Sequence, residues 1–156
     1  MKAFLLKRVA DGTLLPFWNI DANVGARSSN GPVDVQLVQF GFFCMALPSA
    51  KHKDVQLKPI FANVRTGVPC TGKEDDPLVI AIRALEKSRG GPQDGFVSKL
   101  NTDTGIYTEA QKAHQHLLII LLLNIFDTVS DNWPRLDKHP QCPQALKAHI
   151  VSVCKI

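Results

Sequence analysis

The sequence predicts a mainly α-helical fold (α+β), with a small β-hairpin before the helices and a further helix after them. Apolar residues recur at the three- and four-residue spacing of a helix in three long segments. Two short extended runs flank an Asp-Gly pair near the N-terminus, which is typical of a hairpin turn. Hydrophobic residues make up 45% of the chain and charged residues 21%, which indicates a globular protein rather than a disordered one.

We expect a single domain over residues 1–156, because a chain of this length can bury one core. The β-hairpin and a loop should occupy residues 1–29, and the helical core residues 30–130. Within that core, residues 48–74 carry three prolines and little apolar periodicity, so we interpret them as an insertion. The C-terminal helix is expected within residues 131–156.

The hairpin is predicted over residues 3–20, with its turn at Asp11-Gly12, because glycine tolerates the positive φ that such turns require. Pro16 has no N–H to donate to a neighbouring strand, so the second strand should lie at an edge of the sheet. Residues 21–31 are small and polar and predict a connecting loop.

The first helix is predicted to begin at Pro32, a residue suited to a first helical turn, and to end before Pro48. In the insertion that follows, the stretch "PIFANV" at residues 59–64 predicts a short strand or a turn. The apolar stripe of the first helix is formed by Val35, Val38 and Phe42.

The second helix has clear signals at both ends. Asp76 is a suitable N-cap and Pro77 a suitable first helical residue. The sequence Gly-Gly-Pro at residues 90–92 should end the helix, because glycine supplies a left-handed cap and proline blocks continuation. The pair Asp94-Gly95 then predicts a turn into the short extended piece "FVSKL".

A third helix is predicted from Thr108, which forms a capping box with Gln111, to about Val129. Residues 117–126 are apolar on almost every face, so this helix should be buried at the centre of the fold. A last helix is predicted from Pro143 to about Val153, with one apolar side formed by Leu146, Ile150 and Val153.

Two stretches together resemble the peptidoglycan-binding-domain-like family, "VDVQLVQFGFF" and "LVIAIRALEKSRGGPQDGFVS". The resemblance implies a compact three-helix core that binds a cell-wall glycan or peptide, here with a much longer segment between the first two helices. Glu86 stands where that family usually has Gln. The matching residues are Val35, Leu37 and Val38 in the first helix, residues 81–85 in the second, and Gly90, Pro92, Asp94 and Gly95 in the turn.

No arrangement of residues predicts catalysis, a metal site or a cofactor. The cysteines at 44, 70, 142 and 154 match no zinc spacing, and we expect reduced thiols, which favours the cytoplasm. Cys44 lies in an apolar run that should raise its pKa. The acidic residues 74–76 are best explained as charge at a helix N-terminus. Trp18, Tyr107 and Trp133 could form a platform for a sugar, but we interpret them as partly buried core residues.

The charge pattern and the apolar runs exclude two classes of partner. The net charge of +4 comes from scattered lysines and arginines, so no nucleic acid is expected. The apolar run at residues 117–123 is too short to span a membrane, and residues 1–12 are too short of apolar residues for a signal peptide. Action outside the cytoplasm would therefore require non-classical release, such as lysis or a dedicated secretion machine.

We expect a non-enzymatic recognition module that binds peptidoglycan or a related ligand, in a phage or secretion context. The alternative is a structural or adaptor protein that uses the same scaffold for protein–protein contacts, and a small hydrolase is a third class. A glycan-binding protein should show a groove lined by exposed aromatics, an adaptor an apolar surface patch, and an enzyme a deep pocket with titratable groups. The sequence assigns no binding residue.

Overall fold

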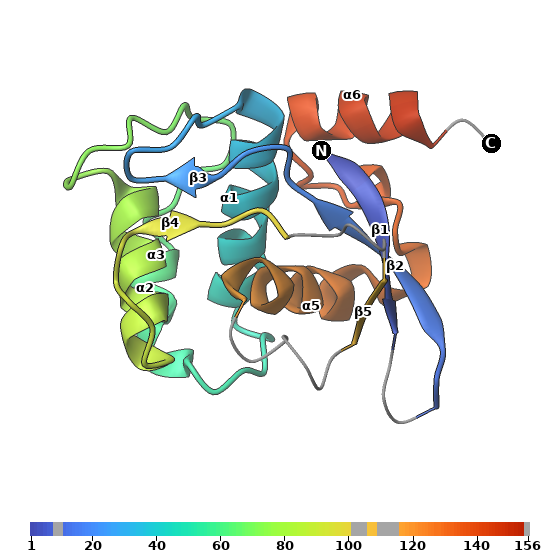
Figure 1. Cartoon of the computed structure of the whole chain (residues 1–156), viewed down its shortest axis with the longest axis horizontal. Coiled ribbons are helices and arrows are strands. Elements are labelled where there is room, and N and C mark those ends of the chain that lie inside the picture. The colour runs from blue at the N-terminus through green and yellow to red at the C-terminus, as the bar shows by residue number, and fades with distance from the viewer. Residues whose placement is uncertain (8–10, 101–105, 109–115, 155–156) are drawn as a thin grey trace.

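A computed structural model describes residues 1–7, 11–100, 106–108 and 116–154 of the chain (Figure 1). The fold is mainly helical, with an antiparallel strand pair near the N-terminus and a C-terminal helix, as the sequence predicts. The helices are α1 (Pro32–Ala46), α2 (Lys58–Phe61), α3 (Pro77–Ser88), α5 (Leu117–Val129) and α6 (Gln144–Val153). The strands are β1 (Lys2–Lys7), β2 (Leu14–Asn19), β3 (Val24–Gly25), β4 (Phe96–Val97) and β5 (Ile106–Thr108), and short 3₁₀ turns lie at Val55–Leu57, Ser130–Asn132 and Leu136–Lys138.

β1 and β2 form the predicted hairpin. They pair antiparallel, with Leu5 opposite Pro16. Gly12 in the connecting turn has a φ of 72°, a left-handed conformation that most residues avoid. β2 is an edge strand of the sheet whose order is β2-β1-β5, which confirms the edge position predicted from Pro16.

The predicted start of the third helix is wrong. Thr108 lies in strand β5, which pairs in parallel with β1, and Gln111 of the predicted capping box lies outside the described residues. The helix α5 begins at Leu117, with His116 as its N-cap. The stretch Ile106–Thr108 contains two β-branched residues and one aromatic, which favour a strand once β1 offers its free edge. Tertiary pairing therefore overrides the local capping signal.

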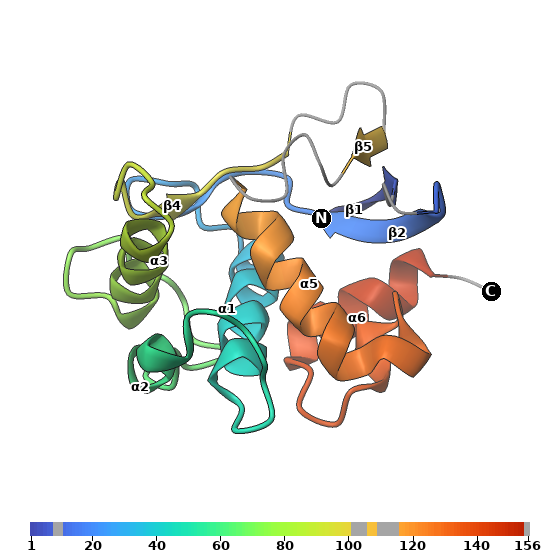
Figure 2. The ribbon, with the colours of Figure 1, turned by 90° about the horizontal axis from the view of Figure 1, so that it is seen from below.

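α1 is the central helix and packs against α5 and α6 on one side and α2 on the other (Figures 1 and 2). The predicted stripe of Val35, Val38 and Phe42 is buried. α5 is also buried along most of its length, as predicted from its uniformly apolar sequence. The two helices approach closely at Gly41, where a Cβ atom would lie 2.7 Å from Cβ of Leu121. A larger residue at Gly41 would therefore push the two helices apart.

α3 begins and ends where the sequence predicts. The Asp76 carboxylate accepts a hydrogen bond from the N–H of Leu78 at 2.8 Å, and Pro77 follows as the first helical residue. At the other end Gly90 has a φ of 71°, and Gly91 N–H donates to the carbonyl of Glu86 at 2.8 Å, which is a Schellman ending. β4 then pairs antiparallel with β3, so the predicted extended piece after the turn is confirmed at its first residues.

Two further local predictions are confirmed only in part: for residues 59–64 the structure has the predicted turn, at residues 62–63, and not the strand, and for α6 one of three predicted apolar contacts is missing. The stretch at residues 59–64 forms no strand, because its first residues belong to the short helix α2, where Pro59 occupies the first turn. Proline fits that position well and lacks the N–H that a strand would use. In α6, Leu146 and Ile150 are buried but Val153 is exposed, so the helix docks on the core through its first two turns only.

Candidate functional site

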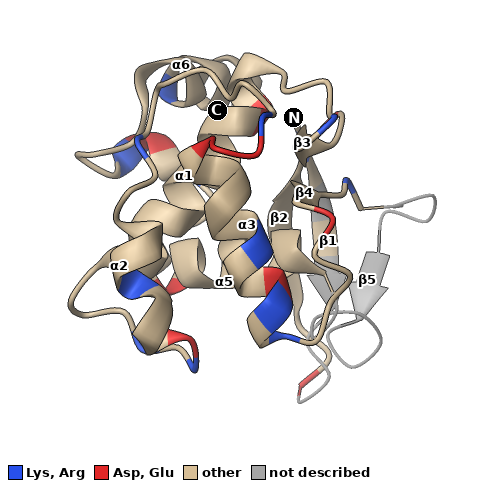
Figure 3. Cartoon of the chain, turned by 90° about the vertical axis from the view of Figure 1, so that its left-hand side faces the viewer, with Lys and Arg blue, Asp and Glu red and all other residues tan. Residues whose placement is uncertain are grey.

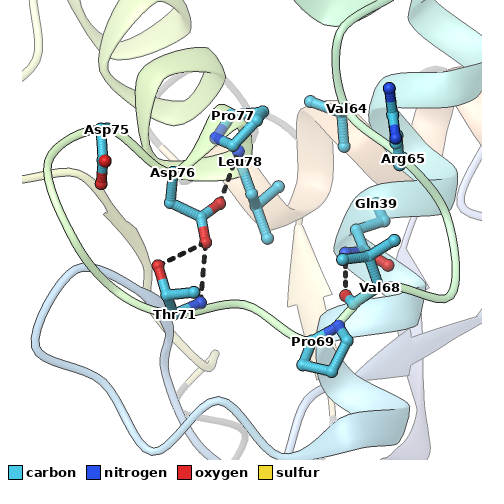
Figure 4. A pocket seen from close by; sticks show the side chains of 10 residues that line it. All are labelled: Gln39, Val64, Arg65, Val68, Pro69, Thr71, Asp75, Asp76, Pro77 and Leu78. Atoms are coloured by element: carbon cyan, nitrogen blue, oxygen red, sulfur yellow. Dashed lines mark hydrogen bonds between the residues drawn. The ribbon is translucent and has the colours of Figure 1, made fainter.

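The most distinctive surface feature lies in the predicted insertion. Residues 64–71, which we call the 64–71 loop, run between α2 and α3 and separate two adjoining hollows. The first hollow, of about 250 Å³, lies between this loop, α1 and the start of α3, and we call it the cap hollow (Figure 4). The second hollow, of about 520 Å³, lies between α2, the loop and α3, and we call it the α2–α3 groove. Its lining consists of Ile60, Asn63, Arg65, Val68, Pro77 and Ile80.

A buried glutamine of α1 fixes the middle of the 64–71 loop. The side-chain amide of Gln39, which is only 3% exposed, donates to the carbonyl of Val68 at 2.6 Å. Its oxygen accepts from the N–H of Gly67 at 3.0 Å. Gly67 has a φ of 83°, a conformation that glycine adopts without strain. Gln39 thus satisfies two loop backbone groups with one side chain and holds the peptide unit between them in place.

The N-cap of α3 fixes the C-terminal end of the loop. One Asp76 oxygen accepts from the backbone N–H of Thr71 at 2.7 Å and from its hydroxyl at 2.9 Å, while the other caps Leu78 (Figure 4). Burial opposes ionisation of this carboxyl, but these hydrogen bonds outweigh it and hold the pKa of Asp76 below its ordinary value of 3.8. The predicted role of the acidic triplet at the helix N-terminus is therefore confirmed for Asp76.

Apolar side chains of the loop and of the neighbouring helix α3 are exposed to solvent. Val68 is 48% exposed and Ile80 is 45% exposed, and both line the α2–α3 groove. Val68 also lines the cap hollow, as do Arg65 and Pro77, so the two hollows share one wall. Exposed aliphatic residues grouped beside a hollow are a feature of contact surfaces and of ligand-binding grooves.

The hollows hold no arrangement suited to acid–base chemistry among the described residues. The buried carboxylate, Asp76, accepts hydrogen bonds from three donors, and the Gln39 amide is paired with the loop backbone. Arg65 and Asp75 are exposed and lie on opposite sides of the cap hollow (Figure 4). The described part of the chain contains no cluster of three or more His, Cys, Asp or Glu residues that could hold a metal ion.

A strongly perturbed carboxyl lies outside the hollows, at Glu86 on α3. Its side chain is 2% exposed and accepts a hydrogen bond from the N–H of Gly95 at 2.9 Å, which ties α3 to the Asp94-Gly95 turn. Burial raises the pKa of Glu86 to about 7, and the neighbouring Asp94 carboxyl adds to this effect, while the Gly95 N–H and the Arg83 guanidinium oppose it. The hydrogen bond from the Gly95 N–H to this carboxyl holds the turn against α3.

The cysteines are all unpaired thiols. Burial raises the pKa of Cys44 to about 12, which confirms the effect predicted from its apolar surroundings, and the pKa of Cys142 to about 11. Cys70 is partly buried, and burial raises its pKa also. None of these three thiols has the lowered pKa of a nucleophile.

Of the three aromatic residues considered as a sugar platform, Trp18 and Trp133 do not form an exposed stacking surface. Trp18 is buried and its indole N–H donates to the carbonyl of Pro134 at 2.9 Å. Trp133 is partly buried against Phe17, with ring centroids 5.0 Å apart, and its indole N–H donates to the carbonyl of Pro16. The Tyr107 side chain lies outside what the structure describes. Both tryptophans are core residues, as predicted.

The sequence did not point to the residues that build this site. Gln39 lies within an apolar helix pattern and Val68 within the least patterned segment, and their contact spans 29 positions of the chain. The one local signal was the combination of an N-cap aspartate with a glycine- and proline-rich segment before it. Such a segment indicates a surface loop, and surface loops often carry binding residues.

No known protein family, curated protein or solved structure matches this chain. The described helices include none that is long and apolar enough to cross a membrane. Fold and site together define a mainly helical protein with two adjoining hollows and a surface loop that hydrogen bonds to Gln39 and Asp76 hold in place.

Proposed function

We propose that this protein is a non-enzymatic recognition module that binds a segment of another protein at the cap hollow and the α2–α3 groove. One observation carries the proposal: Val68 and Ile80 are exposed beside hollows whose backbone is fixed by Gln39 and Asp76. This corresponds to the adaptor function that the sequence left as the alternative.

The ordered loop supports binding, because folding has already fixed its conformation and binding then loses little further conformational entropy. A flexible loop loses conformational entropy when it binds, which weakens the complex. The 64–71 loop is held at Gly67, Val68 and Thr71 by two buried side chains, so little of this loss remains. Covering the exposed parts of Val68 and Ile80 would contribute on the order of 1 kcal/mol each.

Binding of peptidoglycan, the ligand that the family resemblance implies, is the second proposal, together with its bacterial or phage setting. Its support is the pair of helical patterns and the Gly-Pro-Asp-Gly turn, which lie on α1, α3 and the segment after α3. Sugar rings usually stack on exposed aromatics, and the described Phe and Trp side chains are all buried or partly buried. A pull-down with insoluble peptidoglycan at moderate salt tests this proposal, and absence of retention would exclude it.

The proposed location is the cytoplasm. Its support is the set of four unpaired cysteines, because free thiols persist in a reducing compartment.

The adaptor proposal is tested with random peptides displayed on phage and selected on the immobilised full chain. We expect selected peptides whose binding, measured by fluorescence anisotropy, weakens about tenfold in the double variant Val68→Ser, Ile80→Ser. The matched control is Val151→Ser, Val153→Ser, which removes two valines that are each 50% exposed on α6. Equal binding to both double variants, or failure to select any peptide, would refute the proposal.

A further inference from the structure

The arginine at the shared wall of the two hollows, Arg65, has no partner among the residues that the structure describes. Arg65 is exposed and lines both the cap hollow and the α2–α3 groove. It makes no hydrogen bond or ion pair within the described residues, whereas Arg83, Arg89 and Arg135 each pair with a carboxylate. A guanidinium presents a planar set of donors that matches a carboxylate, so Arg65 is available to an acidic group.

The surroundings of Arg65 are aliphatic. Ile60, Val68 and Ile80 line the α2–α3 groove with it, and no acidic residue does. The Asp75 carboxylate belongs to the cap hollow and lies across that hollow from Arg65 (Figure 4). Figure 3 turns the face of α2 and α3 toward the viewer, with the charged residues coloured. The lining of the groove therefore combines aliphatic side chains and Asn63 with one arginine that has no carboxylate partner in the described part of the chain.

We propose that the occupant of these hollows is a peptide segment of a partner protein in which an aspartate or glutamate lies next to aliphatic side chains. The aliphatic side chains would cover Val68 and Ile80, and the carboxylate would pair with Arg65. The net charge of +4 favours the approach of an acidic partner. This inference rests on the proposed function, which it makes specific by naming the chemistry of the bound segment.

A fatty acid shares the combination of a carboxylate and an aliphatic chain, but a peptide fits the site better. Both hollows open onto the surface, with exposed residues such as Asn63 and Asp75 in their walls. An acyl chain there would stay partly in contact with water. The backbone amides of a peptide tolerate such contact and can also bond to polar groups of the walls.

The test uses the full chain and the tightest peptide obtained by phage selection, in an acidic form and in a form with the acid replaced by its amide. We expect Arg65→Gln to weaken binding of the acidic form about fivefold, the upper range for an exposed ion pair, and more in Arg65→Glu. In Arg65→Gln the acidic and amide forms should bind equally, as in a double-mutant cycle. Lys147→Gln, which removes one exposed charge from α6, is the control and should leave binding unchanged.

The outcomes separate this inference from the proposed function. Binding that is lost in Val68→Ser, Ile80→Ser but unchanged in Arg65→Gln would overturn the proposed pairing of a peptide carboxylate with Arg65. It would leave the proposed adaptor function intact. Binding insensitive to all these variants, or no selected peptide, would overturn both. Displacement of the peptide by laurate at a lower concentration than by unlabelled peptide would overturn the choice of a peptide as occupant.

Discussion

Replacement of the buried Glu86 by glutamine should stabilise the protein at neutral and alkaline pH. The folded state raises the pKa of Glu86 from 4.5 to about 7, chiefly by burial, with the Asp94 carboxyl adding to it. A carboxyl whose pKa is higher in the folded state favours folding when it is protonated. Its contribution is therefore fully present below pH 4.5 and is lost as the pH rises toward 7, by about 3 kcal/mol in all.

Glutamine stays neutral throughout this range and can keep the same contacts. Its side-chain oxygen can accept from the N–H of Gly95, as Glu86 does, and its amide can donate to the Asp94 carboxylate. The wild type and Glu86→Gln should therefore have similar free energies of unfolding at pH 4.5, while the variant should be more stable at pH 8 by up to about 3 kcal/mol.

Urea unfolding followed by tryptophan fluorescence at pH 4.5, 6 and 8 measures this difference directly. Asp131→Asn, which removes an exposed carboxylate, is the control for a change of net charge alone. A difference between wild type and Glu86→Gln that does not grow with pH would refute the reasoning, as would a wild type that is more stable than the variant at pH 8.

Three further predictions concern the loop, the turn and the thiols. Gln39→Met leaves the N–H of Gly67 and the carbonyl of Val68 without their partner, so it should lower the free energy of unfolding by about 1–3 kcal/mol and speed hydrogen exchange at Gly67. An unchanged exchange rate at Gly67 would contradict the role of Gln39 in fixing the 64–71 loop. Gly95→Ala places a side chain at a φ of 80°, which alone should cost about 1–2 kcal/mol in urea unfolding; an equally stable variant would argue against this turn geometry. Cys44 should resist iodoacetamide at pH 8 until the chain is unfolded, because burial excludes the reagent and raises the pKa to about 12, and mass spectrometry of labelled peptides would reveal any earlier reaction.

The elements that the sequence predicted correctly carry their own local signals. α1 starts at a proline and α3 is bounded by an aspartate N-cap and a glycine-rich ending. The hairpin has its Asp-Gly turn, and Pro16 gave its edge position. In each case the signal and the structure it specifies lie within a few residues of one another, so no tertiary contact is needed to recognise it.

The elements that it missed depend on contacts between distant segments. The local sequence at Thr108 favours a helix start, but in the fold Thr108 lies in β5, which pairs in parallel with β1. The role of Gln39 depends on a loop that folds back across α1, and the exposure of Val153 depends on how far the core extends under α6. The two hollows belong to this second group, because the cap hollow forms where the 64–71 loop meets α1 and the start of α3, and the α2–α3 groove forms where the loop meets α2 and α3.

Backbone amide chemical-shift mapping of the full chain, titrated with a peptide obtained by phage selection, tests the proposed recognition site most directly. The account predicts that the largest shift changes fall within residues 60–80, around Val68 and Ile80, and that they disappear in Val68→Ser, Ile80→Ser. Changes centred on α5 and α6, or on β3 and β4, would contradict it, because the peptide would then bind at a surface other than the two hollows.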